Sequence, residues 1–167
     1  VKTALTGNSQ FVGVQGYAGS GKTYMLSYLH DKAKQYGFHV EGLAPSHQAT
    51  GLLKEALPNA ETLAARLTRG TARKDAPAPE KTILIVDEAS FVSNNQMLTF
   101  MKQAREQKYA RVVLVGDVKQ LDGVEAGTPF DLLQKMKMPT AIMSDIVRQR
   151  DDNLLSAVHH SIAGEIK

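Results

Sequence analysis

The stretch GYAGSGKT, residues 16–23, constrains this chain more than any other part of its sequence. It matches the pattern G-x-x-x-x-G-K-[ST], whose spacing lets a loop wrap around phosphate oxygens. The apolar run FVGVQ (11–15) before it is typical of a buried strand, and residues 21–36 after it carry apolar side chains at helical spacing. Because a strand and a helix flank the motif, we favour a phosphate-binding loop over a simple glycine-rich turn.

Each constrained position of this loop has a physical task. Glycines let the backbone approach phosphate closely, and consecutive N–H groups together with the helix N-terminus supply partial positive charge. We expect Lys22 to reach the β- and γ-phosphates of ATP, and the Thr23 hydroxyl to bind Mg²⁺. The predicted nucleotide-binding residues are Gly16, Gly19, Ser20, Gly21, Lys22 and Thr23. The loop alone leaves open whether the nucleotide is a substrate, a switch or a fuel.

Beyond the loop, segments typical of strands alternate with segments typical of helices. Expected strands lie at 38–44, 82–88, 110–117 and 140–143, and expected helices at 46–57, 61–68, 94–107, 129–136 and 151–163. The segment 69–81, rich in proline, charge and small residues, predicts a flexible surface loop. Such alternation implies an α/β fold with a parallel sheet and helices on both faces. We expect residues 1–167 to form a single domain.

Composition narrows the class of protein. Apolar residues make up 43% and charged residues 22%, which is typical of a soluble globular domain. No apolar run approaches the roughly 20 residues that span a membrane. The net charge of +3 permits nucleic-acid binding without requiring it. The absence of cysteine excludes disulfides and thiolate metal sites and fits a cytoplasmic protein. Because the sequence begins at Val1, we expect it to be a piece of a longer chain.

Two adjacent acids end a continuous apolar run in ILIVDEAS, residues 83–90. In an enzyme with a phosphate loop, the first acid, Asp87, would hold Mg²⁺ and the second, Glu88, would orient or deprotonate the attacking water. Adjacent carboxylates at the end of a buried strand are costly without a cation nearby. A solvated acid pair is the alternative. A residue placed to deprotonate water favours a protein that hydrolyses its nucleotide over one that only carries it.

A further polar cluster ends the expected strand in VVLVGDVKQL, residues 112–121. If the strands are parallel, Asp117 and Gln120 leave the sheet at the same edge as the loop and the acid pair, where α/β proteins bind ligands. A glutamine at this edge can hydrogen-bond a γ-phosphate or a water. Taken by itself, the cluster is better explained as an ordinary polar turn.

These motifs together carry a resemblance. GYAGSGKT, VDEAS, GDVKQLDGVEAGTPF and IVRQ (146–149) follow the order and spacing of superfamily 1 DNA helicases. The chain looks most like the branch with RecD, Dda and the helicase part of conjugative relaxases of the TraI/TrwC type. The resemblance implies a RecA-like P-loop NTPase that uses ATP and Mg²⁺ to move 5′-to-3′ on single-stranded DNA. It also implies that Gln120 couples hydrolysis to movement and that Arg148 contacts the γ-phosphate.

The same family places contacts with single-stranded DNA in two further motifs. LAPSHQAT (43–50) is similar to the first, with Pro45, Ser46 and His47 at a strand end that turns into a helix. A helix N-terminus can bind a DNA phosphate. AETLAARL (60–67) resembles the second, with Thr62 as the contact. Ser46 as a plain N-cap and His47 as an ordinary exposed residue remain alternatives.

The pattern stops short of a whole helicase. Nothing after Gln149 resembles the second RecA-like domain, which supplies an arginine in trans and is therefore an expected partner. Gln10 lies too close to Gly16 to match the adenine-reading glutamine of the family. Single-stranded DNA and other conjugation proteins are further partners that the resemblance implies. The alternative function is a non-catalytic module of the same fold that binds single-stranded DNA or a recognition partner, and another kind of P-loop ATPase is a third option.

Overall fold

A computed structural model describes residues 8–16, 21–70, 76–121 and 129–143 of the chain. Its described strands form one sheet in the order β3-β2-β4-β5-β1-β6, and every neighbouring pair is parallel. The strands are β1 (Phe11–Gln15), β2 (His39–Ala44), β3 (Glu61–Thr62), β4 (Thr82–Val86), β5 (Arg111–Gly116) and β6 (Thr140–Ile142). The predicted parallel α/β fold is therefore confirmed.

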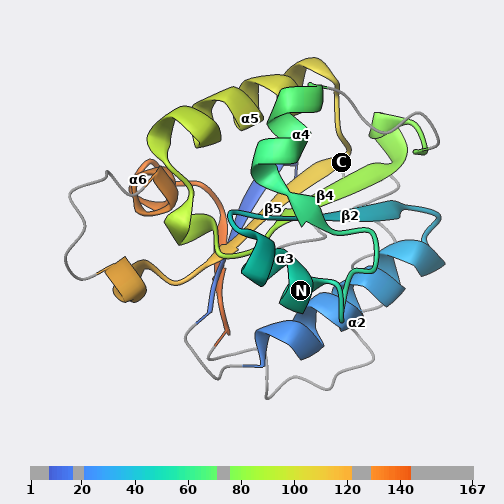
Figure 1. The fold of residues 1–167 in the computed structure, drawn as a ribbon, viewed down its shortest axis with the longest axis horizontal. Helices are drawn as coiled ribbons and strands as arrows, with labels where there is room; N and C mark the ends of the chain where they lie inside the picture. Colours follow the sequence, from blue (N-terminus) through green and yellow to red (C-terminus); the bar gives the residue numbers. More distant parts are fainter. Residues whose placement is uncertain (1–7, 17–20, 71–75, 122–128, 144–167) are drawn as a thin grey trace.

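Helices cover both faces of this sheet, as Figure 1 shows, with α4 and α5 above it and α2 and α3 below it. The α-helices are α2 (Lys22–Gln35), α3 (His47–Leu53), α4 (Leu63–Arg69), α5 (Asn94–Glu106) and α6 (Pro129–Lys135). Three short 3₁₀ turns complete the described elements: η1 (Pro79–Lys81), η2 (Ala89–Phe91) and η3 (Val118–Leu121). Both layers follow from the sequence, because the four inner strands β2, β4, β5 and β1 bury side chains in both directions and need cover on each side.

The core divides according to the alternation of side chains along the strands. In β4, Ile83 and Ile85 pack in one cluster with buried residues of α2 and α3, whereas Leu84 and Val86 pack in the other with those of α4, α5 and α6. Each fully buried aliphatic side chain contributes about 1.5–3 kcal/mol. A continuous apolar run such as TILIV is therefore stable only in the middle of a covered sheet.

Four predicted boundaries need correction. The helix expected at 46–57 ends at Leu53, and hydrogen-bonded turns follow it. The helix expected at 61–68 begins at Leu63, because Glu61 and Thr62 pair with Leu43 and Ala44 of β2 as a short edge strand. The strand expected at 82–88 ends at Val86, which leaves Asp87 and Glu88 in a turn. The loop expected at 69–81 is in part regular, because Arg69 ends α4 and η1 occupies its last residues.

The strand order decides where a site can form. Strands β4, β5 and β1 are neighbours in the middle of the sheet although they are far apart in the sequence. Because they are parallel, the segments that follow Val86, Gly116 and Gln15 all leave at the same edge. Ligands of open α/β sheets bind at the carboxyl ends of the strands. The three polar segments of the sequence therefore converge.

Candidate functional site: a phosphate loop facing an acid pair

The two ends of the predicted phosphate loop need glycine for different reasons. Gly16 donates its N–H to the carbonyl oxygen of Gly116 at 2.9 Å, and a Cβ at this position would lie 2.6 Å from Met143 Sδ. Gly21 has φ +80°, in the left-handed region, at the N-cap of α2. A larger residue at Gly16 would force the Met143 side chain to move, and one at Gly21 would have a strained backbone. Gly19 and Ser20 lie outside the described residues.

Lys22 and Thr23 form the first turn of α2, directly after this loop. Lys22 is half-buried and Thr23 is exposed. The first turn of α2 contains no acidic residue, so its positive end is not neutralised from within the helix. A helix N-terminus of this kind attracts an anion. The residues present therefore fit a bound phosphate.

The acid pair lies in the turn after β4. The Asp87 N–H donates to Leu43 O at 2.9 Å, which holds the turn against β2, and Asp87 Oδ1 accepts from the Glu88 N–H at 2.9 Å. Glu88 has φ 51° and ψ 39°, a left-handed conformation that costs about 1–3 kcal/mol in a residue other than glycine. Strain of this size at a strand end is common at functional sites.

The electrostatics of the pair indicate that it is short of positive charge. Burial raises the pKa of the Asp87 carboxyl above its ordinary value. Burial also raises the pKa of Glu88, and the neighbouring charge of Asp87 raises it further. Lys22 is near enough to lower both pKa values but does not cancel the rise. A cation at the pair would favour the ionised carboxylates.

Mg²⁺ fits the donors that the site offers. Asp87 keeps one carboxylate oxygen clear of its own backbone hydrogen bond, and Thr23 presents an exposed hydroxyl. Magnesium prefers oxygen ligands and is commonly held by one or two carboxylates together with substrate phosphates and water. Within the described ranges, no cluster of three or more His, Cys, Asp or Glu residues forms a metal cage. The site thus suits a metal that arrives with a nucleotide.

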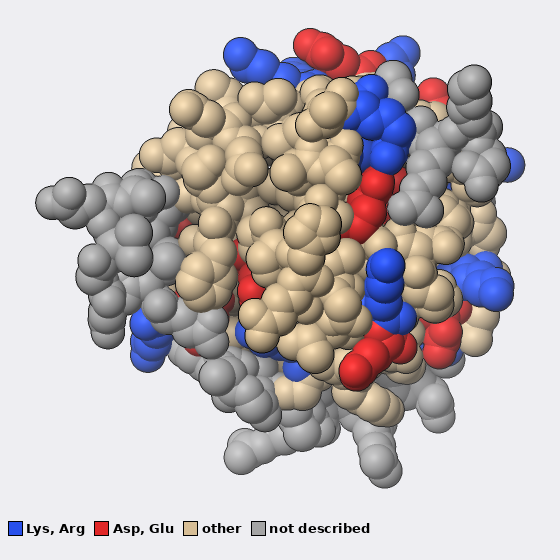
Figure 2. All heavy atoms as spheres, viewed as in Figure 1, with Lys and Arg blue, Asp and Glu red and all other residues tan. Residues whose placement is uncertain are grey.

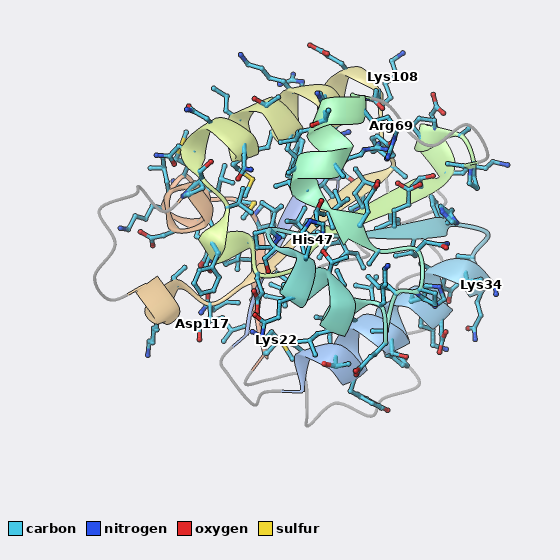
Figure 3. All side chains as sticks on the ribbon, viewed as in Figure 1. Lys22, Lys34, His47, Arg69, Lys108 and Asp117 are labelled. Atoms are coloured by element: carbon cyan, nitrogen blue, oxygen red, sulfur yellow. The ribbon has the colours of Figure 1, made fainter. Side chains whose placement is uncertain are left out.

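The segment after β5 completes the described part of the site. Asp117 is buried, and residues Val118–Leu121 form η3, which carries the backbone of Gln120. Figure 3 shows Asp117 and Lys22 on the same side of the molecule in that view. The side chain of Gln120 and the whole of Arg148 lie outside the described part of the chain. Their predicted contacts with the γ-phosphate remain predictions.

The predicted DNA contacts lie at the ends of β2 and β3, on the same edge. Ser46 is the N-cap of α3, accepting from the Ala49 N–H at 3.1 Å, and Thr62 is the N-cap of α4, accepting from Ala65 at 3.2 Å. Pro45 is half-buried and directly precedes Ser46, and His47 is exposed. The capping alternative for Ser46 is confirmed, although each hydroxyl keeps its own proton to donate.

The residues at the two caps carry hydroxyl groups and no charge of their own. His47 lies near the middle of the view in Figure 3, where Figure 2 shows mostly uncharged side chains, with lysine, arginine and acidic side chains in a column to the right of the middle and at the margins. The helices that the caps begin are short, since α3 and α4 each have 7 residues. We therefore expect any contact made by these residues to be a hydrogen bond rather than an ion pair.

Sequence reasoning missed the residues that hold the site together. Gln15, the last residue of β1, donates from Nε2 to Asp117 Oδ1 at 2.9 Å, and both residues are buried. A Cβ on Gly116 would lie 2.6 Å from Ser90 Oγ, so this glycine lets β5 approach the turn that follows the acid pair. One signal was available for Gln15, because it is the polar member of an otherwise apolar strand and directly precedes the loop.

A parallel sheet covered on both faces, a phosphate loop after its first strand and an acid pair at the same edge define a RecA-like P-loop nucleotide-binding domain. The chain belongs to the AAA_30 family, whose model, described as an AAA domain, matches residues 1–167. It is a helicase-type ATPase domain related to the conjugation proteins TraA and TraI and to RecD2. The predicted resemblance is thereby confirmed.

Several curated proteins are similar over most of this chain. Conjugal transfer protein TraA of Rhizobium radiobacter is 36% identical over 149 residues, which cover 89% of this chain and 13% of that protein. Multifunctional conjugation protein TraI of Escherichia coli K12 is 33% identical, with 98% of this chain and 10% of that protein covered. ATP-dependent RecD2 DNA helicase of Deinococcus radiodurans is 30% identical, with 93% and 22% covered. The chain thus spans a small part of each relative's length.

A solved structure supports the fold. The structure of PRRSV helicase matches with a TM-score of 0.52 at 19% sequence identity, covering 80% of this chain and 30% of that one. At this identity the likeness concerns the fold alone. In the described part of the chain, no helix is both long enough and apolar enough to cross a membrane.

Proposed function

We propose that this chain is the ATP-binding and ATP-hydrolysing motor domain of a 5′-to-3′ translocase on single-stranded DNA, within a cytoplasmic conjugative relaxase. The observation that carries the proposal is the convergence of Lys22 with the acid pair: burial raises the pKa of Asp87 and of Glu88, and the nearby charge of Lys22 lowers both. Relatives whose names describe conjugal transfer and a DNA helicase support this choice among P-loop ATPases.

The residues of the loop would bind and orient the triphosphate. The N–H groups between Gly16 and Thr23 would surround the β-phosphate, and Lys22 would contact the β- and γ-oxygens. Asp87 and Thr23 would hold Mg²⁺, which neutralises charge that develops on the phosphates. Glu88 would orient and deprotonate the water that attacks the γ-phosphate. Its raised pKa brings it nearer to that of an effective base at neutral pH.

Two further residues would report hydrolysis to the rest of a motor. Gln120, carried by η3, and Arg148 would contact the γ-phosphate and lose that contact when the phosphate leaves. A second RecA-like domain would close the site and supply an arginine in trans, which contributes about 10³–10⁵ in rate in related P-loop enzymes. Such a partner would lie in the same natural chain as these residues.

Single-stranded DNA would lie across the ends of β2 and β3. Ser46 and Thr62 would donate their hydroxyl protons to phosphate oxygens while their oxygens cap α3 and α4. Pro45 fixes the turn before the first cap, and His47 presents an exposed ring beside it. Contacts with phosphate and sugar position a nucleic acid without reading its sequence. We therefore expect little sequence preference from this surface.

The test compares two lysines of the same helix in the longest natural chain that contains these residues. Lys22→Ala removes the phosphate contact, whereas Lys34→Ala removes an exposed charge from the last turn of α2. We expect Lys22→Ala to abolish DNA-stimulated ATP hydrolysis and Lys34→Ala to leave it unchanged. Equal activity in the two variants would exclude the proposed site.

The alternative, a non-catalytic module that binds DNA or a recognition partner, predicts a different result. Affinity for single-stranded oligonucleotides would then be the same with ADP, with a non-hydrolysable ATP analogue and with no nucleotide. The motor predicts that these three affinities differ. Retention of Lys22 and of both acids favours the motor, because a binding module has no need of them.

A further inference from the structure

We propose that Gln15 is a positioning residue that couples the phosphate loop to residues 117–121, the segment that carries Gln120. The inference rests on the proposed ATPase function and adds to it a residue that contacts neither nucleotide nor metal. It assigns a role to the buried polar network at the ends of β1 and β5.

All the polar atoms of the Gln15 side chain are engaged. Its Nε2 donates to Asp117 Oδ1 at 2.9 Å. Its Oε1 accepts from the Val118 N–H at 3.4 Å and from Gln134 Nε2 at 3.3 Å. One amide therefore joins the strand before the phosphate loop to the first residues of η3 and to α6.

The hydrogen bonds that Nε2 and Oε1 of Gln15 make differ in strength. The bond to Asp117 is short and charge-assisted, and such bonds are roughly twice as strong as neutral ones. The two bonds to Oε1, one from Val118 of η3 and one from Gln134 of α6, are long for N–H···O, so a small shift of η3 changes the first of them at little cost. The Lys119 N–H also donates to Asp117 Oδ1 at 3.0 Å, which ties that carboxylate to the backbone of η3. A movement of η3 is thus transmitted through Asp117 to Gln15.

The position of Gln15 makes the transmission relevant to the nucleotide. The next residue, Gly16, begins the phosphate loop and donates its N–H to Gly116 O at 2.9 Å. Backbone and side chain therefore join β1 and β5 at adjacent positions, directly before the two loops of the site. Gln15 is 4% exposed, and Asp117 is also 4% exposed. In this setting water does not replace a lost bond at low cost.

A second glutamine at the other end of β1 shows what a purely structural role looks like. Gln10 donates from Nε2 to Ala104 O at 3.2 Å and to Tyr109 O at 2.9 Å. These acceptors are carbonyl groups at the end of α5 and just before β5, remote from the phosphate loop in the sheet. Gln10 therefore provides a matched control, with the same residue type directly before the strand that Gln15 ends.

The experiment measures the ATPase activity and melting temperature of Gln15→Met and Gln10→Met in the longest natural chain. Both variants lose the hydrogen bonds of a side-chain amide, and both should melt at a lower temperature than wild type. Only Gln15→Met should lower kcat, by about tenfold, with KM within about threefold of wild type, because coupling residues change linked equilibria by modest factors. Equal kcat in the two variants would overturn the coupling role.

A charge swap keeps the inference testable if Gln15→Met folds poorly. Gln15→Glu places two carboxylates at a contact that is now 2.9 Å between amide and acid, so it should lower kcat strongly. Adding Asp117→Asn to this variant restores a hydrogen bond between an amide and a carboxylate, with the side chain at position 117 as the donor and the side chain at position 15 as the acceptor. The double variant should return kcat to within about threefold of wild type. No recovery in the double variant would contradict the inference. Absence of ATP hydrolysis in the wild-type chain would instead contradict the proposed function.

Discussion

Two groups of acidic residues in this molecule differ in the positive charges that surround them. The α4 cluster, defined as Glu41, Glu61, Arg66, Arg69 and Tyr109, pairs its acids with guanidinium groups. Arg69 Nη1 donates to Glu61 Oε2 at 2.9 Å, and this pairing raises the pKa of Arg69. Arg66 lies 3.9 Å from Glu41 Oε2, donates to the Tyr109 hydroxyl and stacks 5.3 Å from its ring centre.

The acid pair at the end of β4 has no comparable partner among the described residues. Burial raises the pKa of both carboxyls, and the charge of Lys22 lowers both without offsetting this rise. The comparison teaches that these acids are not placed for the stability of the unliganded fold. The acids of the α4 cluster lie beside guanidinium groups, whereas burial keeps the pKa values of Asp87 and Glu88 raised in the unliganded fold.

The largest expected effect is on the rate of ATP hydrolysis, which should depend on the acid pair and not on the α4 cluster. We expect Glu88→Gln to lower kcat for ATP hydrolysis by about 10²–10⁴, the usual contribution of a general base. Glu61→Gln in the α4 cluster should leave kcat within about twofold. Glu61 pairs with Arg69, and an ion pair near the surface contributes little beyond its own two residues. Steady-state ATPase assays on the longest natural chain measure both. A similar fall in both variants would mean that the acids are not distinct in function.

The next effect should separate the two groups by stability. Arg66→Met leaves the buried Glu41 carboxylate without its guanidinium and should lower the free energy of unfolding by about 3–5 kcal/mol. The double variant Glu41→Leu with Arg66→Met should recover most of this loss, because neither charge then remains buried. Urea unfolding followed by circular dichroism measures both. Failure of the double variant to recover would show that packing, not charge, is lost at Arg66.

A smaller effect of opposite sign is expected at the acid pair. Because folding raises the pKa of Asp87, the folded chain binds this proton more tightly than the unfolded chain. The group's contribution to stability therefore falls as pH rises from its ordinary pKa of 3.8 through the raised folded-state value, and stays unfavourable above it. Asp87→Asn should thus unfold at higher urea than wild type at pH 8 without nucleotide, and this difference should vanish at low pH.

The control for that prediction is Mg·ATP. Bound ligand should stabilise wild type more than Asp87→Asn, because the variant lacks the carboxylate that we propose as a ligand of the metal. The order of the two unfolding midpoints should therefore reverse when Mg·ATP is added. If Asp87→Asn is the less stable chain under both conditions, the acid is structural and the comparison with the α4 cluster fails.

The smallest effect concerns strand ends that carry hydroxyls instead of acids. Ser46→Ala should cost about 1 kcal/mol of stability through loss of the N-cap of α3, and Ser46→Asn should preserve the cap. If Ser46 also contacts DNA, Ser46→Ala and Ser46→Asn should both weaken binding to oligonucleotides, whatever their stability. Fluorescence anisotropy measures the affinity. Normal binding by Ser46→Asn would assign this residue to capping alone.

Much of the fold was predictable because its strands are buried on both faces. Runs such as TILIV and RVVLVG have no other stable place, and the helices between them force a parallel sheet. The edge strand β3 was not predicted, since two residues carry no periodicity. Its register depends on Leu43 and Ala44, which the local sequence does not reveal. The helix at 46–57 was overextended because a turn after Leu53 interrupts an apparently regular pattern.

The candidate site also has a part that the sequence predicts and a part that it does not. Glycine spacing, a lysine and adjacent acids each reflect local chemistry, so the loop and the acid pair were recognisable from the residues alone. Gln15 and Asp117 are 102 positions apart, and Arg66 and Tyr109 are 43 apart. No local pattern connects such residues. Strand order brings the first pair together, and the packing of α4 over the sheet brings the second.

By itself, the sequence determined which groups could hold a phosphate and a metal, because those tasks depend on residue type and short spacing. Only the tertiary structure decided which acids would be neutralised and which would stay short of positive charge. The physical reason is that a carboxylate's free energy depends on its burial and on the charges within a few ångströms of it. In this chain those charges come from elements far away in the sequence, and the fold alone sets their distances.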